Sequence, residues 1–178
     1  MALHVDVLSA TESDSELLQL VFSELSVRLP AEMHDDLDRF VVALDSLPRG
    51  LRAMAATYQL DVSLTLDDLG WHFANWPHLG YRAETQRALH ELETGELATL
   101  FDAACRIADR SWNELVARAA AGPEEFIAWY DASSLKLELA PLHERMLDLL
   151  DLSDEDGEPG LFRHWLLYAR RHPERLCD

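Results

Sequence analysis

Histidine followed directly by glutamate occurs twice in the sequence, and the same pair opens the zinc-binding helix of many metalloproteases. The two pairs are His90-Glu91 and His143-Glu144. Such a helix carries a second histidine four residues after the first, so that both imidazoles lie on one face and bind the same ion. Thr94 and Leu147 occupy those positions. The second ligand is missing, and we expect no metal site.

A short acidic segment, Asp154-Glu155-Asp156-Gly157, is similar to the centre of a calcium-binding loop. If Gly157 took the glycine position of an EF-hand loop, the first ligand would be Leu152 and the last would be Arg163. Neither side chain offers a carboxylate oxygen, which both positions require. We therefore interpret the segment as an exposed acidic loop.

The sequence also lacks the usual signatures of nucleophilic and phosphate chemistry. It has no Gly-x-Ser-x-Gly elbow and no glycine-rich phosphate loop. Its two cysteines are Cys105, which lies in an apolar helical pattern, and Cys177, so they form neither a disulfide framework nor a zinc-binding spacing. We expect a protein that is not an enzyme, with no catalytic residues and no cofactor.

The most aromatic stretch of the chain lies between residues 69 and 81. Its aromatic residues are Trp71, Phe73, Trp76 and Tyr81, with His72 and Asn75 among them. One interpretation is a core in which helices pack. The alternative is a pocket for a small ligand or a substrate, lined by Trp71, His72, Asn75 and Tyr81, because Trp and Tyr are frequent binding anchors. A solvent-reachable cavity would favour the pocket, and a closed core would remove its basis.

Length and composition predict a single all-α domain that covers residues 1–178. A chain of 178 residues buries roughly 70% of the surface that it exposes when unfolded. Glycine and proline, seven of each, are too few for a turn-rich β-sandwich. Apolar residues recur at helical spacing through most of the chain, and the pattern predicts about eight or nine helices.

Several helix boundaries have clear signals. Ser13 and Glu16 form a capping box at the start of one helix. Gly122-Pro123 ends one helix and begins the next, because glycine terminates a helix and proline is favoured in the first turn. Residues 96–121 read as one long helix that could break near Arg110-Ser111.

Other segments are less regular. Residues 3–8 could form a short strand or an extended arm. Residues 51–60 read as a helix, and the alternation of Val62 and Leu64 with polar residues suggests an extended link after it. Thr65 is expected to cap the next helix, which continues to Trp76.

Two residues disturb the helices that contain them. Gly70 costs its helix roughly 1 kcal/mol relative to alanine, so its presence predicts close packing or a local irregularity. Pro141 is expected to divide or kink the helix over residues 135–150, because proline removes a backbone hydrogen bond.

The charge is the most unusual property of the sequence. The chain has 33 acidic and 15 basic residues, and its formal net charge is -18. Such a charge repels nucleic acid and anionic membranes and attracts basic proteins. It could also serve solubility alone. The N-terminal residues do not form a signal peptide and no stretch is apolar enough to span a membrane, so we expect a cytoplasmic protein that binds neither nucleic acid nor membrane.

Carboxylates held on a rigid helical body could imitate the phosphates of duplex DNA. The same Lys and Arg side chains of a DNA-binding protein would then bind either ligand. The candidate partner-binding residues are Asp35, Asp36, Asp38, Asp67, Asp68, Glu124, Glu125, Asp154, Glu155 and Asp156. The expected partner is a basic protein, either a DNA-binding protein or a nuclease.

Two parts of the chain are similar to a known family. The first is Leu69-Gly70-Trp71-His72-Phe73-Ala74-Asn75-Trp76 together with the two helical segments that follow, and the second is the closing Tyr168-Ala169-Arg170-Arg171-His172-Pro173-Glu174. They resemble a family of all-helical bacterial proteins, long classed as a domain of unknown function, that includes a DNA-mimic protein. Leu69-Gly70 departs from the paired glycines of that family, and the first 50 residues show no match.

The resemblance implies an acidic, helical, non-enzymatic protein, and one member of the family inhibits DNA-binding proteins by presenting carboxylates. An immunity protein that neutralises a basic nuclease toxin is a closely related alternative. An acidic structural domain without mimicry also stays open. A second copy of the chain is another candidate partner, since Arg163, Arg170, Arg171 and Arg175 make the last segment basic enough to pair with an acidic face.

Overall fold

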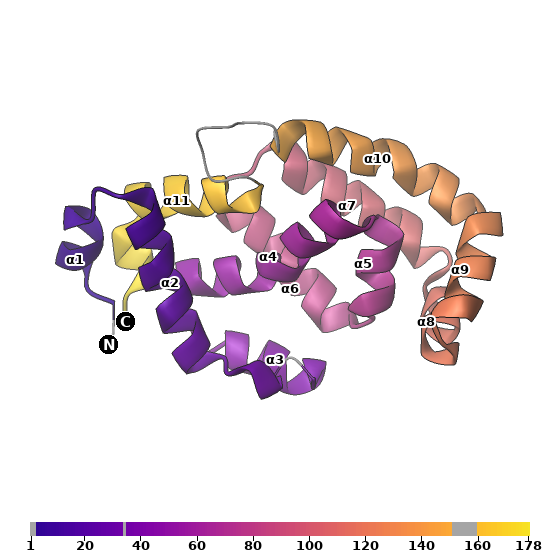
Figure 1. The fold of residues 1–178 in the computed structure, drawn as a ribbon, viewed down its shortest axis with the longest axis horizontal. Coiled ribbons are helices and arrows are strands. Elements are labelled where there is room, and N and C mark those ends of the chain that lie inside the picture. Colours follow the sequence, from indigo (N-terminus) through magenta and orange to yellow (C-terminus); the bar gives the residue numbers. More distant parts are fainter. Residues whose placement is uncertain (1–2, 34, 151–159) are drawn as a thin grey trace.

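The computed structural model describes residues 3–33, 35–150 and 160–178 of the chain. Within these residues it contains eleven α-helices, two short 3-10 helices and no β-strand. The predicted all-α fold is confirmed, and the expected number of eight or nine helices is slightly too low. The helices form an elongated body with the N- and C-terminal ends side by side at one end (Figure 1).

The helices follow one another through short connections. In chain order they are α1 (Val5–Ala10), α2 (Asp14–Arg28), η1 (Ala31–Met33), α3 (Leu37–Leu44), α4 (Arg49–Leu66), α5 (Leu69–Asn75), α6 (Leu79–Glu91), α7 (Glu96–Asp109), α8 (Trp112–Ala121), α9 (Pro123–Ala132), α10 (Ser134–Leu150), α11 (Leu161–Arg171) and η2 (Pro173–Leu176). None of the helices in these ranges is long and apolar enough to cross a bilayer.

Helix α4 connects two hydrophobic cores. Leu51 and Met54 in its first half are fully buried in the first core, which also takes side chains from α1, α2, α3, α6 and α11. Leu60 and Leu64 in its second half are buried in the second core, with side chains from α5 and from α7 to α10. Because both ends of one helix are buried in this way, α4 holds the two halves of the molecule together (Figure 1).

Most of the predicted boundaries are confirmed. The Ser13 hydroxyl accepts a hydrogen bond from the Glu16 backbone N–H at 3.3 Å and caps α2. Pro123 is the first residue of α9, and Gly122, with φ of 120°, separates α9 from α8. The predicted long helix is divided at Arg110-Ser111 into α7 and α8.

Two expectations about irregular segments are wrong. Residues 5–10 form a helix and neither a strand nor an extended arm. Residues 62–64 belong to α4, which continues to Leu66. The alternation of apolar residues there is a consequence of burial, since Leu60 and Leu64 are one helical turn apart and both face the second core. Thr65 lies inside α4, where its hydroxyl donates to the Asp61 carbonyl at 2.9 Å.

Pro141 neither ends nor divides its helix. Helix α10 runs continuously from Ser134 to Leu150. The carbonyl of Leu137, four residues before the proline, is the acceptor that loses its partner. The Leu137 side chain is 77% exposed, so this part of the helix faces solvent, where water can satisfy that carbonyl.

The last helix is anchored to α4 by a buried carboxylate. Asp61, in the middle of α4, accepts a hydrogen bond from the Leu161 backbone N–H at 2.7 Å and so caps the start of α11. Burial raises the pKa of the Asp61 carboxyl above its ordinary value, although the bond from Leu161 opposes this shift. The cap links residues 100 positions apart and fixes where α11 begins against the centre of the molecule.

Candidate functional site

The predicted acidic residues lie at separate places on the structure. Asp35, Asp36 and Asp38 lie at the start of α3, Asp67 and Asp68 lie between α4 and α5, and Glu124 and Glu125 lie in the first turn of α9. Asp154, Glu155 and Asp156 lie outside the described residues. The structure therefore does not bring the described members of this set into one continuous surface.

The carboxylate of Asp68 has a structural role. It caps α5 by accepting a hydrogen bond from the Trp71 backbone N–H at 3.0 Å, and the Tyr130 hydroxyl donates to the same oxygen at 3.2 Å. Thr65 was the expected cap, and Asp68 takes that place three residues later. Asp67 ends α4 and is exposed. The interhelical bond from Tyr130 means that Asp68 is partly buried and poorly placed for a partner.

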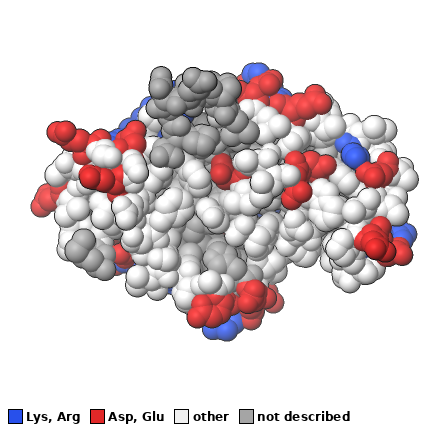
Figure 2. All heavy atoms as spheres, in the orientation of Figure 1, with Lys and Arg blue, Asp and Glu red and all other residues white. Residues whose placement is uncertain are grey.

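The acidic residues before and within the first turn of α3 are all exposed and lie close together in the sequence. We call Glu32, Asp35, Asp36 and Asp38 the α3 acidic edge; all four are exposed. Asp36 caps α3 through the Arg39 backbone N–H at 3.1 Å. Asp38, whose side chain is 92% exposed, lies 2.9 Å from His78 Nε2. In Figure 2 a group of acidic atoms stands at the lower margin of the molecule, where Figure 1 places α3.

Most basic side chains are paired with acids of the same chain. Arg28 contacts Glu24 and Asp178, and Arg145 contacts Glu96. Three arginines of the basic C-terminal segment also form ion pairs within the chain. Arg170 pairs with Asp14, Arg171 with Glu93 and Arg175 with Glu91. Those three guanidinium groups are consequently less available to a second copy than the sequence suggested.

The visible face of the molecule is not uniformly acidic. In Figure 2 the acidic residues stand in separate groups, some at the margin and some on the face itself, with basic atoms beside several of them and uncharged surface between them. The carboxylates of the described residues on this face do not form two parallel rows like the phosphates of a duplex. The surface therefore offers local acidic patches for basic side chains.

The predicted aromatic pocket is not assembled. His72 is buried in the second core and Tyr81 in the first, with 2% and 1% of their surfaces exposed. The Trp71 ring packs against Phe126 at 4.6 Å between centroids, and Asn75 is exposed. These four side chains do not surround a common cavity, so the small-ligand hypothesis loses its geometric basis at this place.

His72 is enclosed on all sides. Its ring lies 5.6 Å from the Phe73 ring and 5.8 Å from the Phe101 ring, and its Nδ1 lies 3.1 Å from the Ser63 hydroxyl. Burial lowers the pKa of His72 from 6.5 to about 3, because a charged imidazolium is poorly solvated in an apolar core. His72 is thus a neutral core residue at physiological pH.

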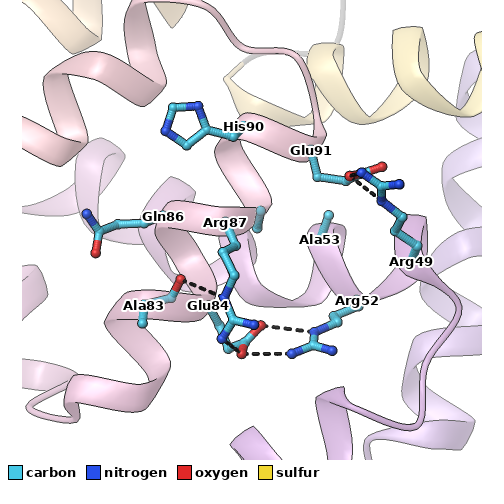
Figure 3. Close-up of a pocket in the computed structure, with 10 residues that line it drawn as sticks. Arg49, Arg52, Ala53, Ala83, Glu84, Gln86, Arg87, His90 and Glu91 are labelled. Atoms are coloured by element: carbon cyan, nitrogen blue, oxygen red, sulfur yellow. Dashed lines mark hydrogen bonds and ion pairs between the residues drawn. The ribbon is translucent and has the colours of Figure 1, made fainter.

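A groove that the sequence did not indicate lies between α4 and α6. Its volume is about 690 Å³. Figure 3 shows arginine side chains from both helices converging on carboxylates in it. The lining residues are Arg49, Arg52, Ala53, Ala83, Glu84, Gln86, Arg87, Ala88, His90 and Glu91.

Ion pairs hold the polar side chains of this groove in fixed positions. Arg52 binds Glu84 through two parallel hydrogen bonds, Nε to Oε2 at 2.9 Å and Nη2 to Oε1 at 2.8 Å. Arg87 also donates to Glu84, and Arg49 pairs with Glu91 at the other end. The Glu84 side chain is only 5% exposed, so its charge is stabilised by the two arginines and links α4 to α6.

The sequence shows the two charged helix faces that line this groove, but not the groove itself. Arg49 and Arg52 are one turn apart on one helix, and Glu84, Arg87 and Glu91 are one turn apart on another, so each set lies on one face. Sequence spacing does not reveal which two helices pack against each other. The groove therefore emerged only from the structure.

Among the described residues, no three His, Cys, Asp or Glu side chains lie close enough together to hold a metal ion. Burial raises the pKa of the Cys105 thiol to about 12, consistent with a packing role for this side chain. Comparisons with protein-family models, with curated proteins and with solved structures found no match to this chain.

Proposed function

We propose that this protein is an acidic binding module that associates with a basic, nucleic-acid-binding protein and blocks it without catalysing a reaction. The partner's Lys and Arg side chains would bind carboxylates in place of phosphates. Encounter would be accelerated by the negative net charge, and charge-assisted hydrogen bonds would hold the complex.

The α3 acidic edge is the observation that carries this proposal. Four carboxylates within seven residues are exposed there, and Glu32 and Asp35 have no ion pair within the described residues. Elsewhere many exposed acids face an arginine of the same chain, as Glu96 faces Arg145 at 2.9 Å. At Glu32 and Asp35 a partner's cations therefore need not displace an ion pair of the described residues, whereas Asp38 already contacts His78.

Neutralising the edge should weaken binding of a basic probe. The variant Glu32→Gln/Asp35→Asn/Asp38→Asn retains Asp36, which caps α3. With each exposed pair contributing up to about 1 kcal/mol, we expect about tenfold weaker binding of a fluorescein-labelled octa-arginine peptide. Fluorescence anisotropy at low salt measures the dissociation constant.

The matched control is Glu12→Gln/Glu16→Gln/Glu144→Gln, which removes three negative charges from exposed acids outside the edge and outside the candidate partner-binding set. Its affinity for the peptide should change by less than about threefold, because charges away from the binding site are screened by salt. The total charge changes equally in both variants, so net charge cannot explain a difference between them. Equal weakening in the two variants would show that the peptide senses only net charge, and would remove the edge as the binding site.

A further inference from the structure

The groove between α4 and α6 has an unusual charge for this protein. Three arginines and two glutamates line it, so its formal charge is positive although the whole chain carries -18. Screening limits the influence of distant carboxylates, because the Debye length is about 8 Å at physiological ionic strength. A small ion in the groove would respond mainly to the residues that line it.

The carboxylates of the groove are already occupied. Glu84 receives hydrogen bonds from Arg52 and Arg87. Glu91 receives them from Arg49 and Arg175, and from the Tyr168 hydroxyl. Each of these two glutamates is therefore flanked by two guanidinium groups, and Arg52 also pairs with Asp45.

The arginines keep unused donors. The Nη1 atoms of Arg49, Arg52 and Arg87 have no hydrogen-bond partner among the described residues, while their other nitrogens are held by Glu84, Glu91, Asp45 or the Ala83 carbonyl. The Arg49 and Arg87 side chains are 69% and 64% exposed. Figure 3 shows the Arg52 and Arg87 guanidinium groups together beside Glu84, the Arg49 guanidinium group apart from them beside Glu91, and Ala53 between the two ion-pair clusters.

We propose that this groove binds a small organic anion, a carboxylate or phosphate ester with a compact apolar body. The acid group would accept hydrogen bonds from the free guanidinium nitrogens of Arg52 and Arg87, with Arg49 at the far end. The apolar body would lie on Ala53, Ala83 and Ala88, which line the groove. The fixed ion pairs with Glu84 lower the cost of binding, because the guanidinium groups are ordered before the ligand arrives.

Titration with three probes of one shape tests this proposal. Benzoate and phenyl phosphate carry the acid group, and benzamide has a similar ring without the charge. We expect saturable binding of at least one acid by calorimetry, with shifts of the Arg52 and Arg87 side-chain NMR signals, and no binding of benzamide in the same range. The stronger acid identifies the carboxylate or the phosphate ester as the natural class.

A pair of matched arginine variants locates the binding. Arg87 and Arg110 both have side chains that are 64% exposed and both contact a glutamate. Arg87→Gln should weaken binding of the acid about tenfold or more, whereas Arg110→Gln should change it less than twofold, although both lower the positive charge equally. In Arg87→Gln the Glu84 carboxylate still pairs with Arg52, so the link between α4 and α6 remains.

Three results would overturn the proposal. The first is binding of benzamide as tight as that of the acids. The second is an equal loss of affinity in Arg87→Gln and Arg110→Gln. The third is a dimer in analytical ultracentrifugation that dissociates in Arg87→Gln, because a second copy would then occupy the groove.

Discussion

Replacement of Gly70 by alanine should destabilise the fold by about 1–2 kcal/mol, in spite of the better helix propensity of alanine. An ideal Cβ at this position would lie 2.2 Å from Cζ of Tyr130 and 2.3 Å from its hydroxyl oxygen. Overpacking of a core costs about 1–3 kcal/mol and occasionally more, against a propensity gain of about 1 kcal/mol. Urea unfolding measures the difference.

The Tyr130 ring cannot easily move away from the added methyl group. It stacks on Phe126 with 5.2 Å between centroids, and its hydroxyl donates to Asp68 at 3.2 Å. A double-mutant cycle with Tyr130→Leu separates the clash from other effects. In the leucine background Gly70→Ala should cost little or even stabilise, and an equal cost in both backgrounds would show that the Tyr130 contact is not the cause.

The second large effect concerns the pH dependence of stability through His72. The pKa of this residue is lowered from 6.5 to about 3 by burial. Below pH 6.5 His72 is protonated in the unfolded state but stays neutral in the folded state. The free energy of unfolding therefore falls as the pH decreases. The loss from this residue is complete near pH 3 and amounts to roughly 5 kcal/mol.

The prediction can be measured between pH 6.5 and 4.5, where His72 in the folded protein remains neutral. Over this interval the unfolding free energy of the wild-type protein should fall about 2 kcal/mol more than that of His72→Gln. If His72→Gln follows the same pH curve as the wild-type protein, the imidazole is not excluded from solvent as described.

Local sequence signals predicted the ends of helices better than their extent. Ser13 and Pro123 act within one turn of themselves, so the structure reproduces their expected roles. The continuation of α4 past Leu60 depends on burial of Leu64 in a core that includes α7 and α10, and this contact has no local signature. Thr65 resembles a cap in isolation, but its hydroxyl bonds the preceding turn of α4.

Gly70 is a position where a local sequence signal predicts the packing but not the residue that it contacts. The cost of a glycine inside a helix predicted either close packing or a local irregularity at this position, and the structure shows close packing. The contacting residue, Tyr130, is sixty positions away, and nothing near Gly70 identifies it. The same limit applied to His72 and Tyr81, which are neighbours in sequence but belong to different hydrophobic cores.

The acidic residues illustrate the difference between composition and arrangement. Net charge follows directly from the sequence, and so does the expectation of a basic partner. The structural role of each carboxylate does not follow from the sequence. Asp68 caps one helix and Asp61 caps another, while Glu32 and Asp35 are exposed. The α3 acidic edge became visible only after the ion pairs of the folded chain were known.

Competition with duplex DNA is the most direct test of the proposed function. The 178-residue protein, immobilised at low salt, should retain a basic nucleic-acid-binding protein from cell extract, and the triple variant of the α3 acidic edge should not. Added duplex DNA should release that partner, because DNA and the carboxylates occupy the same basic surface. Retention of no basic protein, or a stable ternary complex with DNA, would contradict the account.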